Sequence, residues 1–531
     1  MLKKEIKMVL CVVLSFLLAT GVMGFNVKAA AATTYYVSTT GNDSGTGTVD
    51  NPWKTIQKAM NTVRAGDSVY VRGGTYNEKI TVNTSGNATD GYITLQNYPG
   101  ETPVLDGSNL TISSGYSSML WIADKSYIKI IGLEIRNYKT TVKNNLIMGV
   151  YVTGASHDVE IRNCKIHDIQ NNSPISKRGT MGTRDAHGIA VYGTDPSTPI
   201  SNLIVDNCEI YDCVLGSSET LVVNGNVDGW QITNNNIHNT DNIGIDVIGW
   251  EGKCSNSSFD QARNGLVSGN SVHDICTETA VINGKTQYNP CYTANDHSSD
   301  LIYVDGGKNT VIERNKCYNG DFGIEVASEH ANKTTSGITV RNNVIYNNHQ
   351  CGISIGGNEK DSDGSHGDTV NSYFFNNTLC NNDNKNFYNG QICLKRAHDN
   401  QIKNNIIYGT ADEDNTLMLN AYMSATYTYN NTLDYNIWYS SLGSSAAIFQ
   451  WRSSNRQKSW SKYKSASAQE SHSKFVDPLF ANMTSSDFHL LSSSPAINLG
   501  TGTSDQYGTT DFDGTPRVLG GIIDAGAFEK Q

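Results

Sequence analysis

A short repeated phrase constrains the fold of this chain more than any other feature. It consists of an apolar residue, two polar residues, Cys or Asn, one further residue and a second apolar residue. It recurs at residues 161–166, 205–210, 232–237, 267–272, 312–317, 340–345, 374–379 and 402–407. A unit that returns every few tens of residues, with two-residue alternation and Asn or Gly at its corners, is typical of a solenoid of short strands. We therefore predict an all-β solenoid.

The first residues have the pattern of an export signal. Three lysines precede an apolar run from about residue 8 to 25, and small residues at 29–32 offer cleavage sites. We predict a signal peptide over residues 1–32 and a secreted, extracellular protein. Nothing later approaches about 18 unbroken apolar residues, so we expect no membrane span after signal removal.

Charge and cysteine usage narrow the function classes. The full chain carries a net charge of −11, and loss of residues 1–32 removes four Lys and one Glu, which gives about −14. Such a chain is a poor nucleic-acid binder on electrostatic grounds. No CxxC pair suggests a zinc site. We expect buried thiols at repeat positions, namely Cys164, Cys208, Cys317, Cys351, Cys380 and Cys393.

The mature chain, residues 33–531, is predicted to be one β-helical domain in three parts. Residues 33–107 form the N-terminal cap and first coils, and 52–60 have the apolar spacing of a helix. Residues 108–410 form the main coils, with a long loop at 251–299, and 411–531 form irregular coils and a closing segment. A helix that covers the open end suits a terminal repeat.

The N-terminal part also carries a recognisable set of short motifs. These are Tyr36-Val-Ser, Gly41-Asn-Asp43, Pro52-Trp-Lys-Thr-Ile56, Ala65-Gly-Asp67, Arg72-Gly-Gly-Thr-Tyr76 and Tyr98-Pro-Gly100. The segment resembles the start of secreted right-handed parallel β-helix enzymes that act on carbohydrates, including family nine pectate lyases. The resemblance implies a right-handed, single-stranded parallel β-helix with an N-terminal capping helix. The Asn-Ala-Asp-Gly-Phe and Asp-Asp-Gly stretches associated with the catalytic motif of those lyases are not matched.

A second phrase, Gly-apolar-variable-apolar, precedes many of the Asn phrases. It occurs at 149–152, 188–191, 244–247, 323–326 and 352–355, with a looser version at 301–304. Successive residues of a strand point to opposite faces, so the variable residue and the one after the phrase face solvent. Three consecutive coils then present Asp246, Tyr303 with Asp305, and Glu325. Strand spacing places Asp305 and Glu325 roughly 8 Å apart, and Asp246 and Glu325 roughly 10 Å apart.

The segments around these carboxylates supply further candidates for substrate contact. Long loops on a regular scaffold are where binding function usually concentrates. Trp250 and Tyr303 offer flat faces for sugar rings, and Glu329 and His330 follow Glu325 in the chain. We predict that these four residues bind substrate.

The first interpretation of the acidic cluster is a calcium-assisted polysaccharide lyase, and the resemblance favours it. Calcium accepts six to eight oxygen ligands, so Asp246, Asp305 and Glu325 on adjacent coils can share one ion. The ion would neutralise a uronate carboxylate, and Lys395 or Arg263 would remove the adjacent proton. The predicted substrate is then a pectic or other uronic-acid-containing polysaccharide, cleaved by β-elimination.

Two other interpretations remain open. In a glycoside hydrolase, Asp305 and Glu325 would act as an acid and base pair, because roughly 6.5–9.5 Å between carboxyl groups suits inversion. That reaction requires no cofactor. In the third interpretation, the solenoid binds extracellular polysaccharide without cleaving it. We place the lyase first and the hydrolase second. We expect a monomer whose partner is plant cell-wall or other extracellular polysaccharide.

Overall fold

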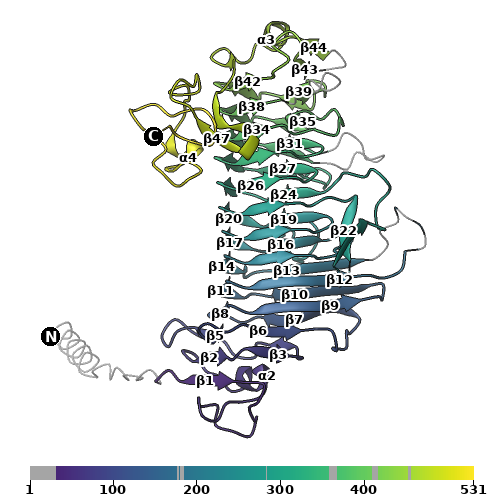
Figure 1. Ribbon diagram of the computed structural model, residues 1–531, viewed down its shortest axis with the longest axis vertical. Coiled ribbons are helices and arrows are strands. Elements are labelled where there is room, and N and C mark those ends of the chain that lie inside the picture. Colours follow the sequence, from purple (N-terminus) through teal and green to yellow (C-terminus); the bar gives the residue numbers. More distant parts are fainter. Residues whose placement is uncertain are drawn as a thin grey trace, which may run out of the picture.

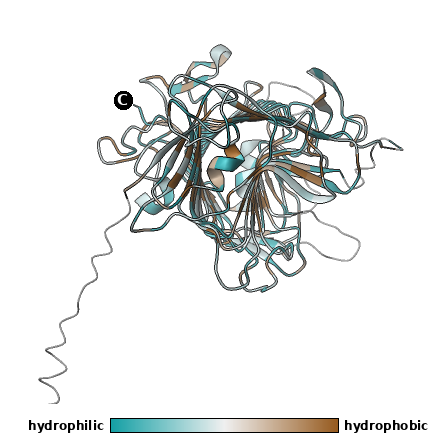
Figure 2. Cartoon of the chain, turned by 90° about the horizontal axis from the view of Figure 1, so that it is seen from below, coloured by the Kyte–Doolittle hydropathy of each residue, from teal (hydrophilic) through white to brown (hydrophobic). Residues whose placement is uncertain are grey.

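Repeated short strands wind into a parallel β-helix, as the Asn phrase predicts (Figure 1). The computed structural model describes residues 31–530 apart from 176, 178, 180–183, 283, 358–366, 410–416 and 453–455. Each full coil contributes one strand to each of three long sheets. Figure 2, which views the molecule from below Figure 1, shows the sheets stacked around a common interior. Most of the predicted signal peptide lies outside the described residues.

The first sheet contains 13 strands among the described residues, all paired in parallel. Its strands are β1 (Thr34–Val37), β2 (Ser68–Val71), β5 (Ile93–Asn97), β8 (Ile128–Ile131), β11 (His157–Arg162), β14 (Ser201–Asp206), β17 (Asp228–Thr233), β20 (Arg263–Ser268), β25 (Val311–Glu313), β29 (Thr339–Arg341), β33 (Tyr373–Phe375), β37 (Gln401–Lys403) and β41 (Thr432–Asp434).

The second sheet also has 13 described strands, and its outward face carries the candidate site. Its strands are β4 (Ile80–Thr81), β7 (Gly115–Ala123), β10 (Asn145–Thr153), β13 (Asp185–Gly193), β16 (Glu219–Gly225), β19 (Ile243–Ile248), β24 (Asp300–Asp305), β27 (Phe322–Ala327), β31 (Cys351–Ile355), β35 (Ile392–Leu394), β39 (Leu417–Ala421), β43 (Ile448–Trp451) and β44 (Arg456–Lys458). Only the last pair, β43 with β44, is antiparallel within this described sheet.

The third sheet has the same number of described strands, again paired in parallel. They are β3 (Gly74–Tyr76), β6 (Pro103–Asp106), β9 (Glu134–Thr140), β12 (Lys165–Asn171), β15 (Glu209–Tyr211), β18 (Asn236–His238), β21 (Ser271–His273), β26 (Lys316–Tyr318), β30 (Val344–Tyr346), β34 (Thr378–Cys380), β38 (Ile406–Tyr408), β42 (Ile437–Tyr439) and β45 (Lys474–Phe475).

Smaller elements decorate the coils. A short parallel sheet joins β28 (Thr334–Ser336), β32 (Asp368–Val370), β36 (Ala397–His398) and β40 (Thr428–Tyr429). Two antiparallel pairs are β22 (Thr279–Ile282) with β23 (Lys285–Tyr288), and β46 (Phe480–Asn482) with β47 (Asp487–Leu490). The helices are α2 (Ile56–Met60), α3 (Trp460–Ser467), α4 (Ser504–Tyr507) and the 3-10 turn η1 (Met483–Ser485).

The predicted capping helix is present as α2, at the N-terminal end of the stack (Figure 1). Its first turn is capped by the Thr55 side chain, which accepts a hydrogen bond from the Lys58 backbone N–H. Ile56, Ala59 and Met60 on its inner face are fully buried in the main core. An apolar helix face therefore covers the open end of the solenoid.

The corner between the first and third sheets explains the repeated Asn. Each ladder residue follows a corner residue, such as Asn342 or Asn376, whose φ lies in the left-handed region, where Asn is tolerated well. The ladder side chains are buried and bond to one another from coil to coil, in the order Asn235, Asn270, Asn315, Asn343, Asn377, Asn405 and Asn436. Glu470 ends the ladder by accepting from the Asn436 side chain.

Two expectations about chain organisation differ from the structure. The segment 251–299, predicted as one long loop, contains β20 and β21, because the Asn phrase at 267–272 forms a regular corner there. Strand β39 and strands β41–β45 continue the three sheets into the part expected to be irregular. All ten cysteines among the described residues are free thiols, including the repeat-position cysteines. No helix in the described part of the chain is long and apolar enough to cross a membrane.

Candidate active site

The strand register of the second sheet places the predicted carboxylates as the second phrase requires. Asp246 of β19 pairs with Tyr303 of β24, and Tyr303 pairs with Glu325 of β27. Asp305 pairs with Ala327, two residues beyond Glu325. Asp246, Tyr303 and Glu325 therefore form one row across three coils, with Asp305 on the diagonal from Glu325.

Two adjoining cavities lie over this row. Cavity A, of about 470 Å³, is lined by Glu325 and Lys395 among others. Cavity B, of about 280 Å³, is lined by Asp246 and Asp305 among others. Both cavities share four residues, namely Ser298, Asp300, Tyr303 and Glu329. We call the two cavities together the acidic groove.

The charge of the acidic groove is strongly unbalanced. Lys395 is the only Lys or Arg among its described lining residues. Seven carboxyl side chains face it, namely Glu219, Asp246, Glu251, Asp300, Asp305, Glu325 and Glu329. Like charges gathered in a partly desolvated site disfavour ionisation, so some of these groups keep a proton or share a cation.

Three of these carboxyl groups are pushed toward the protonated form. Burial raises the pKa of Asp246 well above its ordinary value, and the charges of Glu219 and Asp305 add to the effect. Burial likewise raises the pKa of Asp300 well above its ordinary value, helped by repulsion from Glu325 and a hydrogen bond with it. Burial raises the pKa of Glu219 to about 8. Proton donors are therefore available in the groove at neutral pH.

Asp305 has a backbone N–H and an imidazole close to its carboxyl group. The Glu329 backbone N–H donates to Asp305 Oδ1 at 2.8 Å. His330 Nε2 lies 3.5 Å from Asp305 Oδ2, and this contact with Asp305 raises the pKa of the imidazole. The Tyr303 hydroxyl donates to Glu329 Oε1 at 3.1 Å. The Glu329 backbone N–H therefore fixes the position of the Asp305 carboxyl in the lining of cavity B.

Lys395 lies in cavity A but is poorly suited to accept a proton. Lys395 is only 7% exposed. Burial lowers its pKa, but the neighbouring Cys393 and Glu325 outweigh burial, so the pKa is held above its ordinary value. The ammonium form is therefore the stable one beside Glu325.

Three of the predicted site residues, Arg263, Trp250 and His330, line neither cavity of the groove. Arg263 begins β20 of the first sheet, where its Nε donates to Asp228 Oδ2 at 2.9 Å, and it lines neither cavity. Trp250 also lines neither cavity, and the Lys333 ammonium lies 4.5 Å from the centre of its ring. Tyr303 lines the groove but is only 6% exposed. Its ring therefore forms part of the groove wall and is too buried to stack against a sugar ring.

Sequence reasoning missed Asp300 and Glu219. Glu219, Ile243, Asp300 and Phe322 form a second row of paired positions along the same sheet. Asp300 stands one place before the phrase at 301–304, and the alternation rule assigned no direction to that position. The signal was an acidic residue at the same strand position in two coils, since Glu219 and Asp300 both pair with Ile243.

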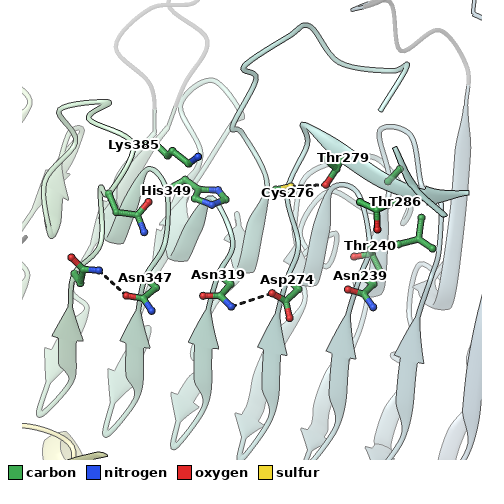
Figure 3. A pocket seen from close by; sticks show the side chains of 14 residues that line it. Asn239, Thr240, Asp274, Cys276, Thr279, Thr286, Asn319, Asn347, His349 and Lys385 are labelled. Atoms are coloured by element: carbon green, nitrogen blue, oxygen red, sulfur yellow. Dashed lines mark hydrogen bonds between the residues drawn. The ribbon is translucent and has the colours of Figure 1, made fainter. Parts of the chain in front are cut away.

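A buried carboxylate also orients two histidines beside the groove. Asp321 Oδ1 accepts hydrogen bonds from Nδ1 of His297 at 2.7 Å and of His349 at 2.8 Å. These three ligand atoms are close enough to hold a metal ion, but hydrogen bonds already satisfy them. His297 lines cavity A, whereas His349 lines a separate polar cavity of about 620 Å³, shown in Figure 3. The site therefore has an imidazole fixed at its edge.

Comparison with known proteins decides the family. Residues 35–251 match the family described as Pel9A-like, right handed beta helix region. The uncharacterized protein YwoF of Bacillus subtilis is 34% identical over 463 residues, which cover 87% of this chain and 91% of that protein. The chain belongs to the Pel9A-like right-handed β-helix family. This membership confirms two predictions: that the β-helix is right-handed, and that the chain resembles the pectate lyases of this fold.

Other relatives of this Pel9A-like chain differ in their named chemistry. Pectate lyase PEL9 of Emericella nidulans is 33% identical over 141 residues, 24% of this chain and 32% of that enzyme. The solved GH136 lacto-N-biosidase of Eubacterium ramulus has a TM-score of 0.51 and 16% identity, covering 76% of this chain and 68% of that one. The latter likeness is one of fold. Together the comparisons support a carbohydrate-active enzyme without separating a lyase from a hydrolase.

Proposed function

We propose that this protein is a glycoside hydrolase that cleaves an extracellular polysaccharide in the acidic groove. The observation that carries the proposal is the chemistry of the groove's titratable groups. Carboxyls whose pKa values are raised lie in the same groove as Asp305, which accepts a hydrogen bond from a backbone N–H, while the neighbours of Lys395 raise its pKa. Pairs of carboxyls whose environments differ in this way supply an acid and a base.

Glu325 delivers the proton in this scheme, and Asp300, which shares a hydrogen bond with Glu325, supplies that proton. Asp300 lines both cavities and Glu325 lines cavity A, so the pair lies where a bond that spans the two cavities would be cleaved. The raised pKa of Asp300, caused by burial and then by Glu325, keeps the proton available at neutral pH. The proton passes through Glu325 to the glycosidic oxygen as the bond from that oxygen to the anomeric carbon breaks.

Asp305 is the base. It accepts a proton from a water molecule whose oxygen bonds to the anomeric carbon, so the products together gain one water. Strand geometry separates the Asp305 and Glu325 positions by roughly 8 Å, within the roughly 6.5–9.5 Å that leaves room for such a water. We therefore infer inversion of the anomeric configuration.

The lyase interpretation loses one of its two predicted bases. β-Elimination requires a deprotonated base next to the acidic proton, and despite burial the neighbouring Cys393 and Glu325 raise the pKa of Lys395. Arg263 is bound to Asp228 on another sheet. The family match also ends at residue 251, before Asp300, Asp305 and Glu325.

Calcium-assisted elimination is the second candidate, because one observation favours it. Asp246 Oδ1 is buried and has no hydrogen-bond partner among the described residues. Its neighbours Glu219, Asp305 and Glu251 offer oxygen ligands of the kind that calcium prefers. Asp246 and Asp305 would hold the ion, with Glu325 from cavity A completing the predicted set. Bound calcium would neutralise a uronate carboxylate and acidify its neighbouring proton.

One assay separates the candidates. The mature protein is incubated with pectic and with neutral plant polysaccharides, with and without a chelator, and new reducing ends and unsaturated uronate absorbance are measured. Hydrolysis predicts reducing ends without absorbance, unchanged by the chelator. Chelator-sensitive absorbance would support elimination, and no product in any reaction would contradict both. The variants Asp300→Asn and Asp305→Asn should be inactive, whereas the matched carboxylate variant Glu160→Gln, on β11 of the first sheet, should be fully active.

A further inference from the structure

The acidic groove ends abruptly on its N-terminal side. The first residues that line cavity B are Ser217 and Glu219, at the start of β16. Described residues of β13 and earlier strands line neither cavity. The row that carries Asp246 nevertheless continues toward β13, because Asp246 pairs with Val222 and Val222 pairs with Ala190. Both Val222 and Ala190 are fully buried on this outward face, so something covers them.

Tyr192 covers the row at β13. His187 Nδ1 donates to the Glu219 carbonyl at 2.8 Å, which leaves Nε2 to accept the Tyr192 hydroxyl at 2.9 Å. Burial lowers the pKa of His187 to about 4, so the imidazole stays neutral in this arrangement. His187 and Tyr192 stand on either side of Ala190 in the strand, and Tyr192 and Ala190 share one apolar cluster. The hydrogen bond therefore holds the Tyr192 ring across the floor of the row.

Further side chains pack around Tyr192 at this end of the groove. The Tyr151 ring packs edge-on against Tyr192 at 5.6 Å, and Tyr116 lies 6.2 Å away. The Lys253 ammonium lies 4.7 Å from the centre of the Tyr192 ring. We call Tyr116, Tyr151, His187, Tyr192 and Lys253 the end wall. Tyr192 is 3% exposed and Tyr116 is 43% exposed, so the wall is filled to its outer surface.

The end wall is continuous with cavity B. Glu251, two residues before Lys253, lines the cavity and accepts a hydrogen bond from the Asn224 side chain at 2.7 Å. Ile248 lines the cavity and belongs to the same apolar cluster as Tyr192. A polysaccharide chain that lies along the row thus meets a packed surface directly beyond cavity B.

Resting on the proposed hydrolase function, we propose that the enzyme acts from chain ends, removing a neutral terminal unit from the non-reducing end of its polysaccharide. Cavity B, at about 280 Å³, lies just below the roughly 300–1,000 Å³ of sites for drug-sized ligands, so it suits one or two sugar rings.

The catalytic assignment fixes the direction of the chain. The base Asp305 lies in cavity B, so the ring whose anomeric carbon is attacked lies there, against the end wall. The leaving oxygen belongs to the next sugar, in cavity A, on the far side of Asp300. The ring in cavity B therefore has no preceding sugar, which makes it the non-reducing terminus.

The charge of cavity B selects a neutral ring. Six carboxyl side chains line it, and its described lining includes no Lys or Arg. These six are Glu219, Asp246, Glu251, Asp300, Asp305 and Glu329. A uronate there would be repelled by each of these carboxyls that is ionised, whereas hydroxyl groups can donate hydrogen bonds to the same carboxyls in either protonation state.

Hexasaccharides labelled with a fluorophore at the reducing end test this proposal. The probes are β-1,4-linked xylose, β-1,4-linked galactose and α-1,4-linked galacturonate. The expected first product from a neutral probe is one labelled species, one or two units shorter, with at least tenfold slower cleavage of galacturonate. Labelled fragments of several lengths in the first minutes would overturn end-wise action while leaving hydrolysis intact. Preferred cleavage of galacturonate would overturn the neutral specificity, and no cleavage of any probe would contradict the proposed function itself.

Variants of the end wall sharpen the test. Tyr192→Ala should open the groove and raise the share of internally cleaved first products at least fivefold, whereas Tyr192→Phe keeps the ring, loses only its hydrogen bond to His187 and should raise that share less than twofold. Because loss of a buried ring can destabilise the coil, Lys253→Ala provides a second, more exposed opening, and thermal unfolding identifies any unfolded variant. An unchanged product pattern in folded Tyr192→Ala and Lys253→Ala would overturn the role of the wall.

Discussion

Two parts of the same coils treat buried polar groups in opposite ways. At the corner between the first and third sheets, Asn343 is fully buried, and its amide donates to both Ile312 and Asn377. On the outward face of the second sheet, Asp246 Oδ1 and Asp300 Oδ1 are buried without a hydrogen-bond partner among the described residues. The corner ladder repeats from coil to coil, whereas the groove carboxyls are confined to a few coils.

This difference separates stability from function. Satisfied buried amides stabilise a unique stacking of coils, because leaving any of them unpaired is costly. Unsatisfied carboxyls with raised pKa values cost stability, and such groups concentrate at functional sites. We therefore expect changes in the ladder to affect folding and changes in the groove to affect activity.

The largest predicted effect is on activity in the groove. Asp305→Asn should lower kcat/KM about 1,000-fold, within the range expected for loss of a general base. Its free energy of unfolding should stay within about 1 kcal/mol of wild type, because repulsion among the groove carboxyls falls. Steady-state kinetics and denaturant unfolding on the same preparation measure both quantities. If Asp305→Asn were strongly destabilised but still active, groove and ladder residues would not differ in role as proposed.

A substitution in the Asn ladder should have the opposite effect, lowering stability while leaving activity nearly unchanged. Asn343→Ala should lower the free energy of unfolding by about 3 kcal/mol, because it leaves partners such as Asn315 and the Ile312 carbonyl unpaired. The folded fraction should keep kcat/KM within twofold of wild type. Asn83→Ala, at an exposed position, serves as the control and should change stability little. A stable but inactive Asn343→Ala would contradict the division of roles.

The repeated parts of the fold were easier to predict from the sequence than the residues of the groove. The solenoid was predictable because one phrase recurs and each copy needs the same corner geometry. The row of Asp246, Tyr303 and Glu325 was predictable because strand alternation fixes side-chain direction. Asp300 was missed because it precedes the regular phrase. Arg263 was misplaced because its loop position did not reveal that β20 joins the first sheet and that Asp228 binds it.

The end of the ladder should show a pH effect on stability. Burial raises the pKa of Glu470 to about 7, although hydrogen bonds from Ser473, Asn436 and Trp438 oppose it. The folded state therefore binds this proton more tightly than the unfolded state, so the stabilisation is present below about pH 4.5 and is lost as pH rises through 7.

Glu470→Gln should remove this dependence. Wild type should lose up to about 3 kcal/mol of unfolding free energy between pH 5 and pH 8 relative to the variant, from the size of the pKa shift. Urea unfolding at the two pH values checks the difference. Parallel pH dependence in both proteins would show that Glu470 does not titrate as described.

The smallest effect concerns the shared wall of the two cavities. Tyr303→Phe removes the hydroxyl that donates to Glu329 Oε1 and keeps the ring. One neutral hydrogen bond contributes about 1 kcal/mol, so kcat/KM should fall about fivefold with little change in unfolding free energy. A loss as large as that of Asp305→Asn would mean that Tyr303 takes part in the chemistry rather than in positioning.

The product masses test the central claim, hydrolysis by the groove carboxyls, most directly. A soluble plant cell-wall polysaccharide fraction is digested in water enriched in oxygen-18, and the first products are measured by mass spectrometry before exchange. The account predicts saturated sugars that carry one oxygen from water, formed by wild type and absent with Asp300→Asn. Unsaturated, unlabelled products, or equal labelling by Asp300→Asn, would contradict it.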